Sequence, residues 1–179
     1  MVEKSDEKNR KSAHLALLAM VFTASLTFSG CLNGYSNESL FPDNVESVRV
    51  EMFDNQTFRR GTEYTLTDAL AKRIEAQTPY KIISSKDRAD TVISGYLVVI
   101  DEALLTMERD TGAPLEKEVE LAAVVNWKDL KTGKMLIDNV TVRAWASYSP
   151  FQNQNFEYAS SLAANNLAIK IVELMEKKW

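Results

Sequence analysis

Histidine and cysteine are almost absent from this sequence. Its 179 residues include one His and one Cys. A single cysteine excludes a disulfide within the chain and a zinc site built from several thiolates. Acidic residues outnumber basic ones, 25 to 21, and the formal net charge is −4. Because a nucleic-acid-binding module is normally basic, we expect no nucleic-acid partner.

Long apolar runs are also lacking, except near the N-terminus. A basic stretch that contains Lys4, Lys8, Arg10 and Lys11 precedes a mostly apolar segment, residues 15–28. This segment is shorter than the roughly twenty residues that a membrane-spanning helix needs. Its length is typical of the apolar core of a secretory signal.

The sole cysteine follows this segment directly, in the order Ser29-Gly30-Cys31. Small residues before a cysteine resemble a bacterial lipobox, so we expect residues 1–30 to be a lipoprotein signal peptide. Cys31 would then carry lipid such as palmitate, and several acyl chains hold a protein firmly to a bilayer. The alternatives are an ordinary signal peptide or an uncleaved anchor, with a buried structural cysteine. Leu32 stands where inner-membrane lipoproteins of proteobacteria carry Asp, which favours the outer membrane.

Cleavage before Cys31 would also remove the only histidine, His14. The chain from 31 to 179 would then have no histidine and no free thiol. These are the commonest general base, metal ligand and reactive nucleophile in proteins. The spacings of a calcium loop and of a phosphate-binding loop are absent too. We therefore expect no enzymatic activity, no metal and no cofactor.

The remaining chain divides into a polar tether, residues 31–44, and one domain, residues 45–179. Alternating apolar residues predict strands, and apolar residues three or four apart predict helices. The expected strands are 45–53, 80–85, 92–102, 118–130 and 135–147, and residues 104–107 are a candidate continuation of the third strand into a hairpin. The expected helices are 62–77 and 156–177. Residues 54–57 are expected to break the first strand, and Thr65 and Asp68 to cap the first helix. This order predicts an α+β domain: a two-layer sandwich in which two helices pack on one face of a single mixed, mainly antiparallel sheet.

Four short segments resemble a known family in their order and spacing. They are Gly34-Tyr35 after the cysteine, a strand at 48–57 that ends in an aromatic residue, Asn and Thr, the helix start at 63–70, and Ala89-Asp90 leading to Gly95. Together they resemble the lipopolysaccharide-assembly lipoprotein family, LptE. The resemblance implies a lipid-anchored protein on the periplasmic face of the outer membrane, without hydrolytic or transfer chemistry. It would act as plug and assembly partner of the β-barrel LptD and help to deliver lipopolysaccharide.

A second function stays open. The aromatic-Asn-Thr strand end and the Ala-Asp strand start also occur in other envelope lipoproteins with a related α/β core. These include activators of peptidoglycan synthases and lipoproteins of curli-type secretion. The alternative is therefore a lipoprotein that activates a peptidoglycan synthase or serves a secretion pore.

Candidate binding residues are basic and aromatic, because the phosphates of lipopolysaccharide would pair with Arg or Lys. Arg109 lies at the predicted tip of the long hairpin, and Lys117 lies on its returning strand. They are ligands for glycolipid or the barrel wall, or else turn charges balanced by neighbouring acids.

Two further pairs are candidates. Arg59 and Arg60 beside Phe58 are anion ligands or ordinary loop charges. Arg143 and Trp145 share one face of the last strand. They form a partner surface, or else Arg143 pairs with Glu120 or Asp129 beside a half-buried tryptophan.

Overall fold

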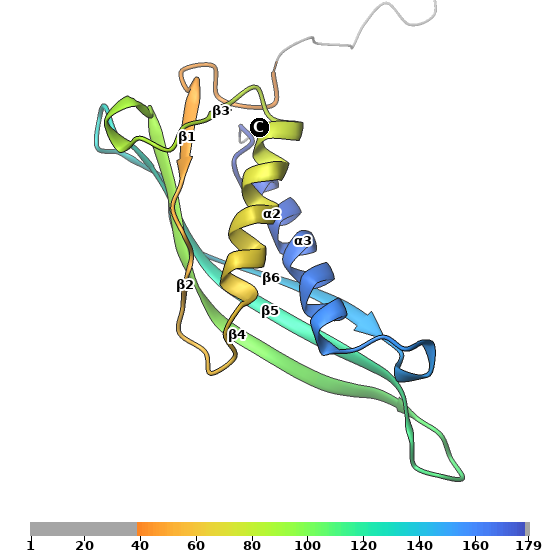
Figure 1. Ribbon diagram of the computed structural model, residues 1–179. Helices are drawn as coiled ribbons and strands as arrows, with labels where there is room; N and C mark the ends of the chain where they lie inside the picture. Colours follow the sequence, from red (N-terminus) through yellow and green to blue (C-terminus); the bar gives the residue numbers. More distant parts are fainter. Residues whose placement is uncertain (1–38, 178–179) are drawn as a thin grey trace, which may run out of the picture. The chain divides into compact units, whose positions relative to one another are not determined.

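The computed structural model describes residues 39–177 (Figure 1). In chain order its elements are β1 (Ser47–Val50), β2 (Asp54–Asn55), α2 (Thr62–Gln77), β3 (Lys81–Ile82), a 3-10 helix (Lys86–Arg88), β4 (Thr91–Met107), β5 (Pro114–Asp129), β6 (Met135–Tyr148), a second 3-10 helix (Pro150–Gln152) and α3 (Phe156–Leu174). The expected signal peptide, Cys31 and the first part of the tether lie outside the described residues, so they remain predictions.

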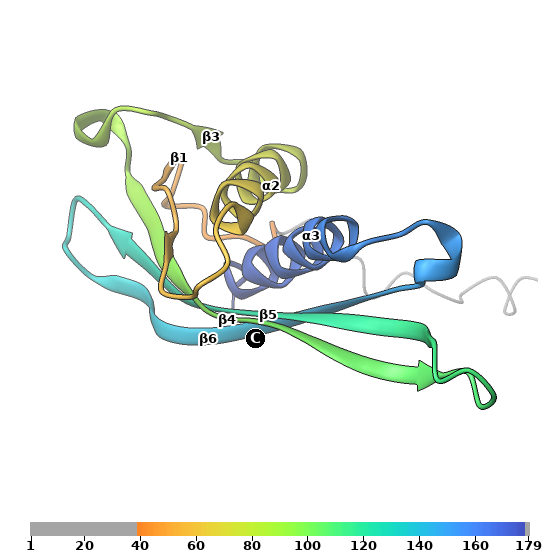
Figure 2. The same cartoon turned by 60° about the horizontal axis from the view of Figure 1, so that its bottom comes forward.

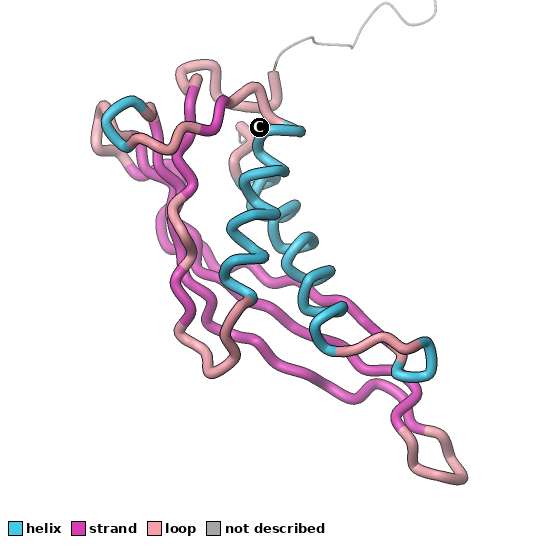
Figure 3. Tube along the Cα trace, in the orientation of Figure 1, coloured by secondary structure: helices cyan, strands magenta, loops and turns pink. Residues whose placement is uncertain are grey.

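The strands form one sheet in the order β3-β1-β4-β5-β6, and β2 lies beside β4 further along (Figure 3). β4, β5 and β6 are an antiparallel meander joined by short turns. β1 pairs in parallel with both β3 and β4, and β2 pairs in parallel with β4. The sheet is therefore mixed, and most of its pairing is antiparallel, as predicted.

Both helices lie on one face of this sheet (Figure 2). Each helix buries residues three or four apart, which is the spacing that brings them onto one side. Leu66, Leu70 and Ile74 of α2 and Leu167 and Ile171 of α3 are fully buried. They share one core with alternate residues of β5, from 119 to 127. The predicted two-layer α+β architecture is confirmed. None of the described helices is long and apolar enough to cross a membrane.

The first predicted strand is wrong in detail. β1 ends at Val50, and Asp54 and Asn55 form a second strand instead of breaking the first. Glu51 N–H donates to Ile93 O and Gln56 N–H donates to Leu97 O. The two donors are five residues apart in the sequence, whereas the two acceptors on β4 are four residues apart, so this strand holds one extra residue. The extra residue is a bulge, which bends the strand and interrupts its pairing.

The predicted cap of α2 is also wrong. The helix begins at Thr62, so Thr65 and Asp68 lie within it. Gly61 precedes the helix with a φ of 106°, a conformation that glycine adopts without a steric penalty. Glu63 accepts the Gly61 N–H at 2.9 Å and replaces the expected cap.

Candidate partner and glycolipid surface

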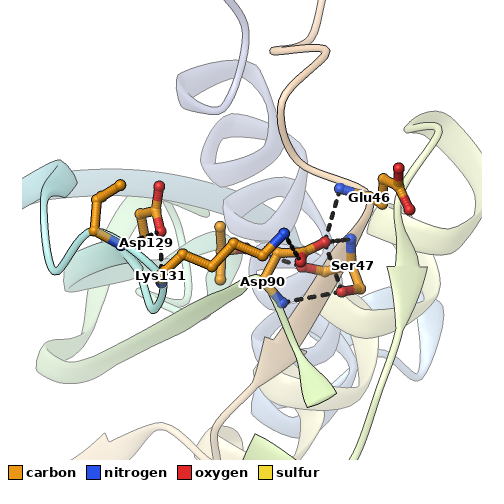
Figure 4. A network of polar contacts seen from close by, with 7 residues as sticks. Glu46, Ser47, Asp90, Asp129 and Lys131 are labelled. Carbon is orange, nitrogen blue, oxygen red and sulfur yellow. Dashed lines mark hydrogen bonds and ion pairs between the residues drawn. The ribbon is translucent and has the colours of Figure 1, made fainter. Parts of the chain in front are cut away.

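Asp90 joins three segments at one end of the sheet (Figure 4). Its Oδ2 accepts the main-chain N–H of Glu46 at 3.1 Å, the N–H of Ser47 at 3.0 Å and the Ser47 hydroxyl at 2.9 Å. Lys131 Nζ, in the turn after β5, lies 2.6 Å from Oδ1. Lys131 and the other donors lower the pKa of Asp90 to about 2. The Ala-Asp strand start therefore fixes β1 against β4 and leaves this carboxylate engaged.

Asn55 organises the loop before α2. Its Oδ1 accepts the N–H and the hydroxyl of Thr57, at 2.8 and 2.7 Å. Its Nδ2 donates to Arg59 O and to Glu63 Oε2, both at 2.7 Å. The guanidinium of Arg60, a predicted anion ligand, donates to Asn55 O at 2.8 Å. The Asn-x-Thr segment thus shapes a loop through side-chain bonds to the main chain, as Asn often does in turns.

Glu102 of β4 is the centre of a polar cluster on the helix face of the sheet. The Tyr148 hydroxyl donates to Oε1, and Lys117 Nζ lies 3.5 Å from the same oxygen. The Arg59 guanidinium lies 3.9 Å from Oε2. The Tyr148 hydrogen bond and the two cations lower the pKa of Glu102. Burial and the bond to Glu102 raise the pKa of Tyr148 to about 12.

This cluster brings together two of the predicted binding residues, Arg59 and Lys117. Arg59 also stacks on Phe156, with its guanidinium carbon 4.0 Å from the ring centroid. Lys117 pairs with Tyr148 across β5 and β6, which places it at the base of the long hairpin and not at its tip. Sequence reasoning missed Glu102. The sequence carried no signal for it, because a register shift between Leu97 and Val99 reverses the alternation of β4 and brings position 102 to the helix face.

Arg143 and Trp145 lie at the outer edge of the sheet on β6. Arg143 forms an ion pair with Glu120 of β5, one of the two partners that the sequence suggested. Two side chains of α3 reach the same edge: Lys170 Nζ donates to Arg143 O at 2.7 Å, and Asn166 Nδ2 donates to Trp145 O at 3.0 Å. Lys170 Nζ also lies 4.9 Å from the Trp145 ring centroid. These two residues therefore contribute to a strand edge that α3 already covers.

Residues 104–116, here named the hairpin arm, extend past the end of β6 (Figure 2). The last residue of β6 pairs with Lys117, so the arm has two strands and no third neighbour. Leu104, Leu105 and Met107 are 47%, 48% and 57% exposed. Such a run of exposed apolar side chains is typical of a surface that contacts a partner or lipid.

The tip of the hairpin arm is a closed turn. Glu108 N–H donates to Ala113 O at 2.8 Å, and Gly112 N–H donates to Glu108 O at 2.9 Å. The Glu108 carboxylate accepts the Thr111 hydroxyl. Arg109 is exposed in this turn and forms no ion pair with any residue between 39 and 177. Of the five basic residues among the predicted binding residues, Arg109 is the one whose side chain has neither an ion pair nor a hydrogen bond in the described part of the chain, whereas Arg60 donates to Asn55 O.

A groove of about 380 Å³ separates the arm from the loop that follows β6. Thr106, Leu115 and Gln152 are among its lining residues. Ser149 Oγ donates to Leu115 O at 2.8 Å and ties the loop to the arm. Phe151 in this loop is exposed. One end of the domain therefore combines apolar surface, a groove and one cation. In the part of the chain that the structure describes, no cluster of His, Cys, Asp and Glu is suited to a metal ion.

Comparison with known families identifies the domain. Residues 45–176 match the model of LptE, described as lipopolysaccharide-assembly. The chain belongs to the LptE family. The match runs from before β1 to beyond α3, so the resemblance suggested by the short segments is confirmed. No curated protein matches the LptE-family chain.

Solved structures with a similar fold include several lipoproteins. The solution structure of lipoprotein B from Nitrosomonas europaea has a TM-score of 0.52 at 12% identity, covers 79% of this chain and is itself 88% covered. The rare lipoprotein B from Shewanella oneidensis has a TM-score of 0.47 at 13% identity. The alignment covers 71% of this chain and 92% of the Shewanella chain. The PelC dodecamer from Paraburkholderia phytofirmans has a TM-score of 0.47 at 14% identity. The alignment covers 80% of this chain and 96% of the PelC chain. The likeness to the Nitrosomonas protein supports the α+β fold of the LptE-family chain.

Proposed function

We propose that this LptE-family protein is lipid-anchored at the periplasmic face of the outer membrane, where it assembles with an LptD-like β-barrel in lipopolysaccharide delivery. The hairpin arm contacts the glycolipid or the barrel. The observation that carries this proposal is the arm itself, in which exposed Leu104, Leu105 and Met107 stand beside Arg109, an arginine without an ion pair among the described residues. Lipopolysaccharide offers acyl chains and phosphates, which require apolar surface next to a cation. Because the chain is acidic overall, this attraction must be local.

The substitution Arg109→Glu tests the arm. It replaces attraction to a phosphate by repulsion, and an exposed turn residue contributes little to stability. Arg88→Glu is the matched control. Arg88 is also exposed, but it lies just before the start of β4, whereas Arg109 follows the end of that strand. We expect Arg109→Glu to fold normally but to bind lipopolysaccharide more weakly or to yield less mature barrel, and Arg88→Glu to match the wild type. Unchanged binding, barrel maturation and outer-membrane permeability in Arg109→Glu would contradict the proposal.

The partner is tested by purification from detergent-solubilised outer membrane. We expect a β-barrel of LptD type to co-purify with the full chain. Recovery of a peptidoglycan synthase in its place would support the alternative function and would count against the barrel.

The anchor is tested at Cys31. The substitution Cys31→Ser removes the thiol that would receive the lipid. We expect an uncleaved precursor that incorporates no labelled palmitate. Normal incorporation in this variant would rule out lipidation at Cys31.

A further inference from the structure

The outer edge of β1 is only partly paired. β3 covers its first half, where Ile83 N–H donates to Val48 O at 3.0 Å. Glu51 N–H donates toward β4, so the main-chain groups of the flanking residues Val50 and Met52 are directed away from β4. Among residues 39–177, none of the N–H and C=O groups of Val50 and Met52 has a hydrogen-bond partner.

The other outward groups near this edge are satisfied by side chains. Phe53 N–H donates to Thr67 Oγ1 at 3.1 Å, and Asn55 O accepts from Arg60 at 2.8 Å. At the opposite edge of the sheet, Lys170 and Asn166 cover two carbonyls of β6. Proteins usually protect sheet edges in such ways, because a free edge is a template for another strand. The main-chain groups of Val50 and Met52 thus lack the side-chain cover that their neighbours Phe53 and Asn55 have.

A groove of about 640 Å³ runs along this gap, between β1 and α2. Met52 and Tyr64 line it and are 54% and 62% exposed. Ala71, a small residue, lines the groove on the side of α2, and Ile83 lines it on the side of β3. The groove therefore offers apolar contacts beside unpaired main-chain groups, which together are the requirements for binding an extended peptide.

The charges that line the groove favour a basic occupant. Arg49 and Glu51 pair with each other at 3.7 Å, and Asp68 pairs with Lys72 at 2.6 Å. Asp54 is exposed and has no ion pair within the described part of the chain. An unpaired carboxylate at one end of the groove attracts Lys or Arg and repels Asp or Glu.

We propose that this groove binds an extended segment of a partner polypeptide by strand addition, and that the segment alternates apolar and basic residues. Its main chain would pair with Val50 and Met52, and its apolar side chains would pack on Met52 and Tyr64. Alternate side chains point to opposite faces of a strand, so the basic residues would lie on the side of Asp54. This surface is distinct from the hairpin arm, and the inference does not depend on the glycolipid proposal.

The test uses the full chain in detergent and three capped peptides of equal length. The first is Lys-Val-Lys-Val-Lys-Val-Lys, the second has Glu for Lys, and the third is the basic peptide with alternate main-chain nitrogens methylated. We expect the basic peptide to bind at least tenfold more tightly than either control and to slow hydrogen exchange at the Val50 and Met52 amides. Equal binding of all three, absence of binding at millimolar peptide, or unchanged exchange at both amides would overturn the proposal.

Two variants locate the binding. Met52→Pro removes one unpaired N–H, whereas Met52→Ala keeps it, so the proline variant should bind the basic peptide at least tenfold more weakly than the alanine variant. If the two variants bind equally, strand addition at this edge is excluded. Should Met52→Pro fail to fold, the exchange measurement on the wild type still decides. Arg109→Glu should bind the peptide normally, which separates this site from the hairpin arm.

Discussion

The ring of Phe53 lies directly against the backbone of Gly95. A methyl group added at Gly95 would lie 2.6 Å from Phe53 Cε1 and 2.3 Å from Val124 O. Phe53 is buried and lies in the bulged segment that separates β1 from β2. The aromatic strand end and the glycine of β4 are two of the segments on which the family resemblance was based. Their contact explains why an aromatic residue and a glycine stand at these two positions.

We expect Gly95→Ala to destabilise the protein by about 1–3 kcal/mol, the usual cost of forcing extra volume into a packed core. The carbonyl of Val124 belongs to the neighbouring strand, so it cannot turn aside as a flexible side chain would. Urea denaturation should show a lower midpoint with an unchanged slope. Ser94→Ala, on the opposite face of β4, is the control and should have a small effect. Equal stability of wild type and Gly95→Ala would show that the contact is looser than described.

The Asp90 cluster predicts a dependence on pH. The pKa of Asp90 falls from 3.8 to about 2 on folding, so its stabilisation is complete above about pH 4 and is lost as the pH falls toward 2. We expect Asp90→Asn to be less stable than wild type by about 1–2 kcal/mol at pH 7. The difference should shrink between pH 4 and pH 2 in unfolding experiments. The control Asp87→Asn, at an exposed neighbouring carboxylate, should be about as stable as the wild type at pH 7.

Tyr148 predicts an effect at alkaline pH. Its pKa is raised from 10.0 to about 12, so the stabilisation is present below pH 10 and is lost as the pH rises toward 12. We expect Tyr148→Phe to be less stable than wild type by about 1–2 kcal/mol at pH 7, because the bond to Glu102 is lost. Between pH 10 and 12 the two proteins should converge. The exposed Tyr64 supplies the control, and Tyr64→Phe should differ little from wild type in stability at pH 7.

The cover on the β6 edge predicts a change in association state. The double substitution Asn166→Ala and Lys170→Ala would uncover the carbonyls of Arg143 and Trp145. Free edges pair with other chains, so the variant should self-associate at concentrations where the wild type does not. Sedimentation velocity over a concentration series measures this. Lys72→Ala removes a lysine of α2 that pairs with Asp68 and not with β6, and it should leave the sedimentation unchanged. Identical behaviour of the double variant and the wild type would show that the cover is dispensable.

The regular elements could be predicted from local spacing. The bounds of α2 and the start of α3 are as expected, because both helices carry apolar residues at helical spacing and end or begin at clear signals. The meander followed from alternation and from the turn at Gly133, whose φ is 74°. β2 and the bulge could not be predicted, since a two-residue strand has no period and its pairing depends on β4.

The candidate surface could be predicted only at the hairpin tip. Arg109 is exposed because a turn at the end of two unsupported strands has few neighbours, and this follows from the sequence. The partners of Arg59, Lys117 and Arg143 depend on strand register and on loops that meet in space. Glu102 became visible as the partner of Arg59 and Lys117 only once the strands were aligned. Glu120 was already one of the two partners expected for Arg143, and the strand register decides between them.

The long separation between β1 and β4 sets an order for folding. Ser47 and Asp90, which join these strands, are 43 residues apart, whereas the strands of the meander are joined by short turns. Contacts between distant residues form late, because closing a longer loop costs more chain entropy. β1 is the first of the described strands to be synthesised, and it is among the last to pair with its neighbour. A chain that emerges N-terminus first exposes β1 before its partner strand exists, and the half-covered edge of β1 stays open to other strands throughout that interval.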